Sequence, residues 1–402
     1  MSSSARSLDD LQPLAYHAAV VAYLKQCEPE VWAWGSSADA ERDYVEQMRK
    51  GLLKECYRLE ADAHPDLAGR CRDVAARLGV SAPITLYQAG GDGPMNASLF
   101  YAPGEAHVVF SGAVLERLGG VELEAVLAHE LAHYRLWEHQ SRDCLVADRL
   151  MVAAANDPRA SASHQHTAQR LRLYTEIYAD RGSFVGCGQL DAAVAALVKM
   201  ATGLAQVSAE SYLRQADELF ALSERSARQT DHPEMFIRAR ALRLWTEGDA
   251  QVDAWLAAEI EGDAGVDTLC LVGQRRVVQS TRRVLEELLR PKWMQTPAML
   301  AHAKAFFPDF RPRNTPDEGL AAALGEQAAA SHDYWCYLLL DFARADRDLE
   351  DLPLLRALAL ASLCGWHERL EKIAAVELGL TKRQLARLQK DAPDLLRKAE
   401  EP

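Results

Sequence analysis

The strongest constraint on this chain is the segment His129-Glu130-Leu131-Ala132-His133. Two histidines four residues apart lie on the same face of an α-helix, so both imidazoles can bind one metal ion, and this spacing is typical of zinc. Glu130 lies between them along the chain and can reach a water in the open position of the ion, where it would act as general base. The segment therefore predicts the site of a zinc hydrolase.

The residues before this segment favour a helix. Residues 121–128 carry apolar side chains at helical spacing, and Gly119-Gly120 breaks the chain just ahead of them. We therefore expect the motif to lie on a real helix. The alternative without chemistry is a pair of surface histidines on an amphipathic helix.

A catalytic zinc ion needs a third protein ligand, and one candidate is His139. It lies where the third histidine of the metzincin motif would lie, but that motif needs a glycine at the position of Leu136 so that the chain can turn out of the helix. The chain looks helical there instead. His139 would then point away from the face that His129 and His133 share.

The other candidate is Glu176, which shares one face of a second predicted helix with Asp180. Glu176 would complete a set of two histidines and one glutamate, while Asp180 could hydrogen-bond a ligand imidazole and fix its tautomer. The same two acids could instead form a solvated helix face and pair with Arg172 or Arg181. The spacing alone leaves both interpretations open.

Five ordered elements between Met95 and Arg240 resemble the HtpX-like and CAAX prenyl protease family of zinc metalloendopeptidases, which is of the gluzincin type. The elements are Asn96-Ala97, residues 107–115, residues 124–133, residues 176–181, and Thr230-Asp231-His232-Pro233 followed by Arg238 and Arg240. By this resemblance, one zinc ion per chain would be held by His129, His133 and Glu176. Glu130 would activate the water, and Asp180 would orient a ligand.

The resemblance also implies a peptide or protein substrate and an activity of class EC 3.4.24. An open sheet edge at residues 108–111 would receive the extended peptide as an extra strand, with Asn96, Ala97 and Val109 as substrate-binding residues. His232 would donate to the oxyanion or approach zinc in a resting state. Alternatively, His232-Pro233 is only a loop and a helix start.

The expected fold is mainly α (α+β), a zincin-like metallopeptidase core with a small antiparallel sheet, flanked by helical N- and C-terminal regions. We expect three helices in residues 8–79, short strands at residues 84–88, 97–101 and 107–111, and helices after Ser111. The expected regions are a helical N-terminal region (1–80), the metallopeptidase domain (81–250), a helical region with a proline-rich linker (251–320) and a helical C-terminal module (321–402).

The C-terminal module resembles the helical TerB-like domains of tellurite-resistance proteins. The resemblance rests on an apolar helix that begins at Asp333 and is followed by a group of acids: Asp341, Asp346, Asp348, Glu350 and Asp351. These acids could bind a cation or form a solvated acidic loop. We assign the module to regulation or to binding of a protein partner.

Composition and sequence patterns indicate which partners and which cellular location to expect. The net charge of -13 argues against a nucleic-acid partner. No apolar run reaches the roughly 20 residues that a membrane-spanning helix needs, and the N-terminus has no signal-peptide pattern. The eight cysteines form no C-x-x-C pair, which is typical of reduced thiols. We therefore expect a cytoplasmic protein that does not span a membrane.

A different class of function also fits parts of the chain. The protein could be a non-catalytic scaffold whose helical C-terminal half recruits partners and whose metal site is structural or idle. The complete motif argues against this alternative, because an idle site has no chemical need for Glu130.

Overall fold

The computed structural model describes residues 6–37, 39–91, 93–222, 235–262, 265–325 and 330–400. The chain forms two compact units, Met1–Gly262 and Asp263–Pro402. The finer division into four regions stays a prediction. None of the described helices combines the length and the apolar character that crossing a membrane requires.

The N-terminal part of the first unit is helical, as expected, but it is divided further. Its described elements are η1 (Leu8–Asp10), α1 (Ala15–Cys27), α2 (Pro29–Gly35), α3 (Asp39–Glu55) and α4 (Pro65–Arg77). We expected three helices in this region. The additional boundary lies at Pro29, which begins α2 because proline lacks the N–H that a continuing helix would need.

One four-stranded sheet follows, and it contains the three expected strands and one more. The strands are β1 (Cys56–Arg58), β2 (Ile84–Ala89), β3 (Asn96–Ala102) and β4 (Glu105–Ser111), in the spatial order β1-β2-β4-β3. The hairpin between β3 and β4 turns at Pro103-Gly104, where Gly104 has a φ of 74°. The strand β4 lies between β2 and β3 and runs parallel to β2 but antiparallel to β3, so the sheet is mixed rather than antiparallel throughout.

The expectation that residues 108–111 present an open edge is wrong. Val109 pairs with Tyr87 on β2 and with Ser98 on β3, and only 8% of its surface is exposed. The strand order instead puts β3 at one edge of the sheet, and Asn96 and Ala97 lie on it. A local strand pattern does not reveal which strand will be central, because that depends on the connections between strands.

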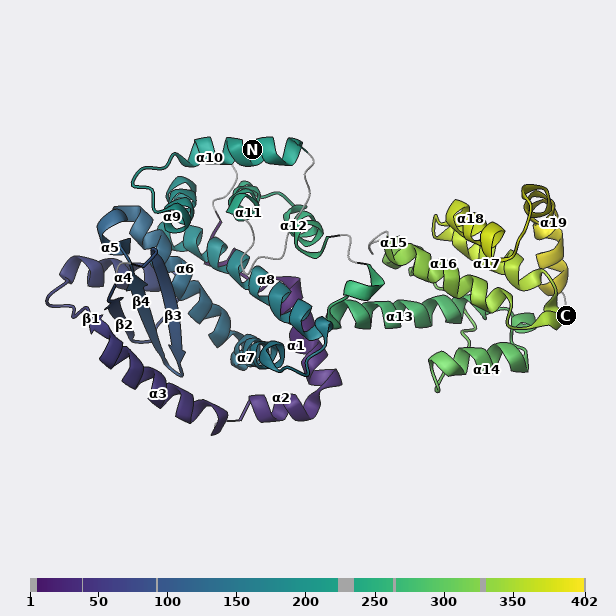
Figure 1. Cartoon of the computed structure of the whole chain (residues 1–402), viewed down its shortest axis with the longest axis horizontal. Helices are drawn as coiled ribbons and strands as arrows, with labels where there is room; N and C mark the ends of the chain where they lie inside the picture. Colours follow the sequence, from purple (N-terminus) through teal and green to yellow (C-terminus); the bar gives the residue numbers. More distant parts are fainter. Residues whose placement is uncertain are drawn as a thin grey trace. The chain divides into compact units, whose positions relative to one another are not determined.

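Helices cover both faces of this sheet. Met48 and Leu52 of α3 pack with the sheet residues Tyr87, Ala102 and Val109 in one apolar cluster. The opposite face is covered by α6 (Gly120–Glu138), which contacts β3 and β4 (Figure 1). The mainly α fold with one small sheet is therefore confirmed.

The rest of the first unit is helical in its described residues, as expected for the chain after Ser111. Besides α6, the elements are α5 (Val114–Arg117), η2 (His139–Arg142), α7 (Asp143–Asn156), α8 (Ala162–Cys187), α9 (Leu190–Thr202), α10 (Ala209–Ala221), α11 (Met235–Glu247) and α12 (Val252–Glu261).

The second unit is built from helices around its own core. Its elements are η3 (Val266–Thr268), α13 (Leu271–Leu288), η4 (Lys292–Met294), α14 (Pro297–Phe306), α15 (Leu320–Gly325), α16 (Ala330–Ala343), η5 (Arg347–Leu349), α17 (Leu352–Leu363), α18 (His367–Glu377) and α19 (Lys382–Glu400). Trp335 stacks on Trp366 in the core, with ring centroids 5.4 Å apart. The prolines expected to form a linker lie within this unit, and Pro297 begins α14.

Two of the five acids have structural partners: Asp341, near the end of α16, and Asp346, in the segment after it. Asp346 caps η5 and accepts a hydrogen bond of 2.6 Å from Thr296 Oγ1, while Asp341 lies 2.6 Å from His302 Nε2. Among the described residues, this loop contributes no group of three metal-ligating side chains. The solvated acidic loop is therefore the better of the two interpretations.

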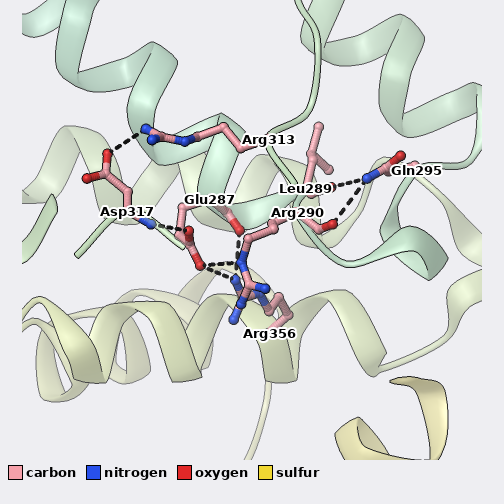
Figure 2. Close-up of polar contacts among 7 residues, drawn as sticks. All are labelled: Glu287, Leu289, Arg290, Gln295, Arg313, Asp317 and Arg356. Carbon is pink, nitrogen blue, oxygen red and sulfur yellow. Dashed lines mark hydrogen bonds and ion pairs between the residues drawn. The ribbon is translucent and has the colours of Figure 1, made fainter. Parts of the chain in front are cut away.

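A buried carboxylate, Glu287, connects three segments of the second unit (Figure 2). Its Oε1 accepts hydrogen bonds from Arg290 Nε at 3.0 Å and from Arg356 Nη2 on α17 at 2.8 Å, and its Oε2 accepts one from the backbone N–H of Asp317 at 3.1 Å. Asp317 is in turn paired with Arg283 and Arg313. Glu287 is only 4% exposed, so these partners replace the water that the carboxylate loses.

We expect Glu287→Ala to destabilise the second unit by about 3 kcal/mol, because it leaves the partly buried Arg290 and Arg356 without their shared partner. Hydrogen–deuterium exchange of the α13 and α17 amides in the full-length protein measures this as faster exchange. The control is Asp309→Ala, which removes an exposed ion pair with Arg282 and should leave exchange nearly unchanged. Equal exchange in both variants would contradict the assigned role of Glu287.

Candidate metal centre

The helices α6 and α8 pack unusually closely, and this packing sets the geometry of the site. A Cβ atom added at Gly182 would overlap the Cβ of Ala132, and one added at Gly186 would overlap the Cβ of Ala128. Two glycines one turn apart therefore face two alanines one turn apart, with the two helices antiparallel. This close contact brings the His129 turn of α6 within reach of Glu176 on α8.

The three expected ligands come together in the structure. His129 Nε2 lies 3.6 Å from Glu176 Oε2, and His133 Nε2 lies 3.8 Å from Glu176 Oε1. The two imidazole rings have centroids 5.0 Å apart. One atom from each of these side chains can be chosen so that all lie within 4.8 Å of one another.

This donor set fits a zinc ion. Ligand atoms about 2.0–2.2 Å from a tetrahedral ion are separated from one another by roughly 3.3–3.6 Å. The two nitrogen–oxygen distances found here, 3.6 and 3.8 Å, are close to this range, while one atom from each of the three side chains can be chosen within 4.8 Å of the others. Two imidazole nitrogens and one carboxylate are donors that zinc accepts in catalytic sites, where a further position stays open. The residues present therefore could hold zinc once the donor atoms move closer together.

Asp180 occupies the position expected of an orienting residue. Its Oδ1 lies 3.2 Å from His129 Nδ1, so the Nδ1–H can donate to the carboxylate and leave Nε2 free to bind a metal. Burial lowers the pKa of His129, but hydrogen bonds to Asp180 and Glu176 outweigh burial and raise it to about 10. The two carboxylates therefore place negative charge beside His129. A proton on the imidazole can balance this charge, and a bound metal cation can take the place of that proton.

Arg238 on α11 is a part of the site to which the sequence assigned no role. Its Nε and Nη2 donate to the two oxygens of Asp180 at 2.7 and 2.6 Å, and Nη2 also lies 3.2 Å from Glu176 Oε2. Although burial alone would raise the pKa of Asp180, the guanidinium of Arg238, together with His129, outweighs burial and holds this pKa below its ordinary value. The only sequence signal for Arg238 was its place after the His-Pro pair, 58 residues from Asp180.

Glu130 is buried, with 6% of its surface exposed, and it faces the same cavity. Burial raises its pKa to about 7, although the nearby His129 and a hydrogen bond from the backbone N–H of Leu99 lower it in part. A carboxyl group with a pKa near neutrality can both accept and return a proton. Burial lowers the pKa of His133 to about 4, so this imidazole is neutral and able to bind a metal.

A cavity of about 590 Å³ surrounds these residues. Asn96, Ala97, Ser98 and Leu99 of the edge strand β3 form one wall, so two of the three expected substrate-binding residues border the cavity. Val109, on the central strand β4, does not.

The remaining candidates lie elsewhere. Leu136 is helical, as expected, and His139 follows the last residue of α6. His139 lines a different cavity, beside Arg135 and Glu138, and does not belong to the ligand cluster found among the described residues. His232 lies outside the described residues.

Residues 61–246 match the profile of peptidase family M48, and this range contains every residue of the ligand cluster. The family match confirms the resemblance stated from the motifs. Comparison with curated proteins and with solved structures finds no match for the chain.

The contact between α6 and α8 can be tested by Gly182→Ala. Despite the better helix propensity of alanine, we expect a loss of about 1–3 kcal/mol in stability and a weaker affinity for zinc, because the added methyl group pushes the two ligand-bearing helices apart. Thermal unfolding and zinc titration against a chelator measure both effects.

The matched control is Gly51→Ala on α3, where an added Cβ meets no atom within 4 Å. This change should be neutral or slightly stabilising and should leave zinc affinity unchanged. If Gly182→Ala behaved in the same way as Gly51→Ala, the close contact would not be what positions the ligands.

Proposed function

Residues 61–246 belong to peptidase family M48, and from this premise we propose that the protein is a zinc-dependent metalloendopeptidase of class EC 3.4.24 with one zinc ion per chain. The observation that carries the proposal is the convergence of His129, His133 and Glu176 beside the buried Glu130. These groups lie in a cavity bordered by a sheet edge, which suits an extended peptide or a protein segment.

Each residue of the site has a separate role in the proposed reaction. His129, His133 and Glu176 hold the metal, and Asp180 fixes the His129 imidazole. When bound, zinc supplies Lewis acidity toward the scissile carbonyl and the attacking water. Glu130 takes a proton from that water and passes it to the nitrogen of the leaving amine. Arg238 keeps Asp180 ionised throughout.

The edge strand β3 is suited to bind the substrate backbone. Along an antiparallel strand, alternate residues point their backbone N–H and C=O groups away from the partner strand. The Leu99 N–H points toward Glu130 rather than toward β4. Ala97, two residues earlier, therefore presents its backbone groups on the same open side, and the Asn96 side chain lies beside it at the edge. We assign both residues to peptide binding.

Three further expectations stay predictions. The first is an oxyanion role for His232. The second is partner binding by residues 321–402, and the third is a cytoplasmic location.

The Glu130→Gln variant tests the proposed mechanism. It removes the proton acceptor and keeps the shape of the side chain, so kcat/KM on a cleavable peptide should fall about 100-fold to 10,000-fold while zinc stays bound. Elemental analysis and peptide cleavage followed by mass spectrometry measure the two quantities. Glu116→Gln, at an exposed position on α5, is the control and should retain full activity. Undiminished cleavage by Glu130→Gln would exclude Glu130 as the base.

A further inference from the structure

We propose that Asp148 binds a positively charged group of the substrate beside the metal site, so that the protein prefers peptides with a lysine or arginine close to the cleaved bond. A free amino terminus carries the same charge, and peptides with blocked ends distinguish it from a side chain. This inference rests on the proposed function and adds a substrate class to it.

Asp148 lies on α7, which packs against both ligand-bearing helices, α6 and α8 (Figure 1). It borders the same cavity as the metal ligands, together with Trp137 of α6 and Arg172 of α8. Trp137 follows His133 by one helical turn, and the centroids of their rings are 5.9 Å apart. Arg172 precedes Glu176 by one turn. Asp148 therefore belongs to a part of the cavity that adjoins the metal site.

The proposed mechanism gives Asp148 no role. Four carboxyl groups occur among the described residues that line the cavity. Glu176 and Asp180 belong to the metal site, where both contact Arg238, and Glu130 is the proposed base. Asp148 is not part of the ligand cluster found among the described residues. Its presence in the cavity therefore needs a different explanation.

The surroundings of Asp148 do not balance its charge. Burial raises its pKa to about 6, and the guanidinium groups of Arg172 and Arg149 offset this rise only in part. No hydrogen bond from a described residue contributes to the balance. A carboxylate that loses water without gaining a donor is costly, and a cation placed beside it recovers that cost. A positively charged substrate group would supply the missing partner.

The two arginines act on Asp148 through their charge at a distance rather than through hydrogen bonds. The guanidinium carbon of Arg149 lies 5.8 Å from the centre of the Tyr101 ring, and Arg149 is not among the residues that border the cavity. Arg172 does border it. An anionic substrate group would face Asp148 as well as Arg172. Because Asp148 is the group whose burial is not offset, positive charge is the favoured partner.

Trp137 suits the same kind of ligand. Indole is the aromatic side chain that attracts a cation most strongly, and it can also pack along the methylene stem of a lysine. A carboxylate and an indole ring that border one space can thus bind both the charge and the apolar stem of a basic side chain. A neutral side chain with the same stem gains only the second contact.

The first test uses zinc-loaded, full-length wild-type protein and peptides that are blocked at both ends. Lysine, glutamate and norleucine, which has the stem of lysine without its charge, are placed in turn at each position near the cleaved bond. We expect lysine to raise kcat/KM about 10-fold or more over norleucine at one position. A second set of peptides with a free amino terminus shows whether a terminal amine can replace the side chain.

Two variants link this preference to Asp148. Asp148→Asn keeps the shape of the side chain and removes its charge, so the ratio of kcat/KM for lysine to that for norleucine should fall about 10-fold or more. Asp148→Glu keeps the charge and should retain more of this ratio. The matched control is Asp143→Asn on the same helix, at an acid that pairs with Lys25 at 2.6 Å outside the cavity lining, and it should leave the ratio unchanged. A folding defect lowers the rates for all peptides together and does not change a ratio.

The outcomes separate the cation pocket from the peptidase assignment. Cleavage without a lysine preference, a preference for glutamate at the same position, or a lysine preference that Asp148→Asn leaves unchanged would overturn the pocket and leave the peptidase assignment intact. A preference that needs a free amino terminus and is lost in Asp148→Asn would support the pocket and assign it to the terminal amine. Failure of the zinc-loaded wild type to cleave any peptide would overturn the proposed function, and the pocket with it.

Discussion

The close contact between α6 and α8 is the constraint on which the candidate site depends. Gly182 and Gly186 leave space that Ala132 and Ala128 fill, so the two backbones approach more closely than larger side chains would allow. His129 and His133 lie on one of these helices and Glu176 on the other. The ligand geometry is therefore a consequence of helix packing, supported by β3 and by the salt bridge that ties α9 to α6.

Charge balance is the second requirement of this site. Glu130, Glu176 and Asp180 would repel one another in a buried cavity if no cation were present. Arg238 pairs with Asp180 and also contacts Glu176, while Glu176 and the two imidazoles can still bind a metal. The positive charges of the arginine and of a bound zinc ion would together balance the negative charge of the carboxylates. The Glu287 network is a second buried charge cluster, in the other unit. There arginines satisfy the carboxylate, and the described residues of that unit contribute no group of three metal-ligating side chains.

Local patterns predicted much of this arrangement. Spacing along a helix indicated His129, Glu130 and His133, and the resemblance selected Glu176 over His139 as the third ligand. The open edge of the sheet was assigned to the wrong strand, because strand order depends on how β4 inserts between β2 and β3. The contact of Arg238 with Asp180 could not be predicted either. The place of Arg238 after the His-Pro pair carries no signal of the aspartate, 58 residues away, with which it pairs.

The central claim is that His129, His133 and Glu176 form a zinc site, and the most direct test is metal content. Wild type, Glu176→Ala and His139→Ala would be purified without chelator, checked for folding by their thermal midpoints, and measured by elemental analysis. We expect one zinc ion per chain in wild type and in His139→Ala, and a loss or marked weakening of zinc binding in Glu176→Ala. Zinc retained by Glu176→Ala but lost from His139→Ala would contradict this account.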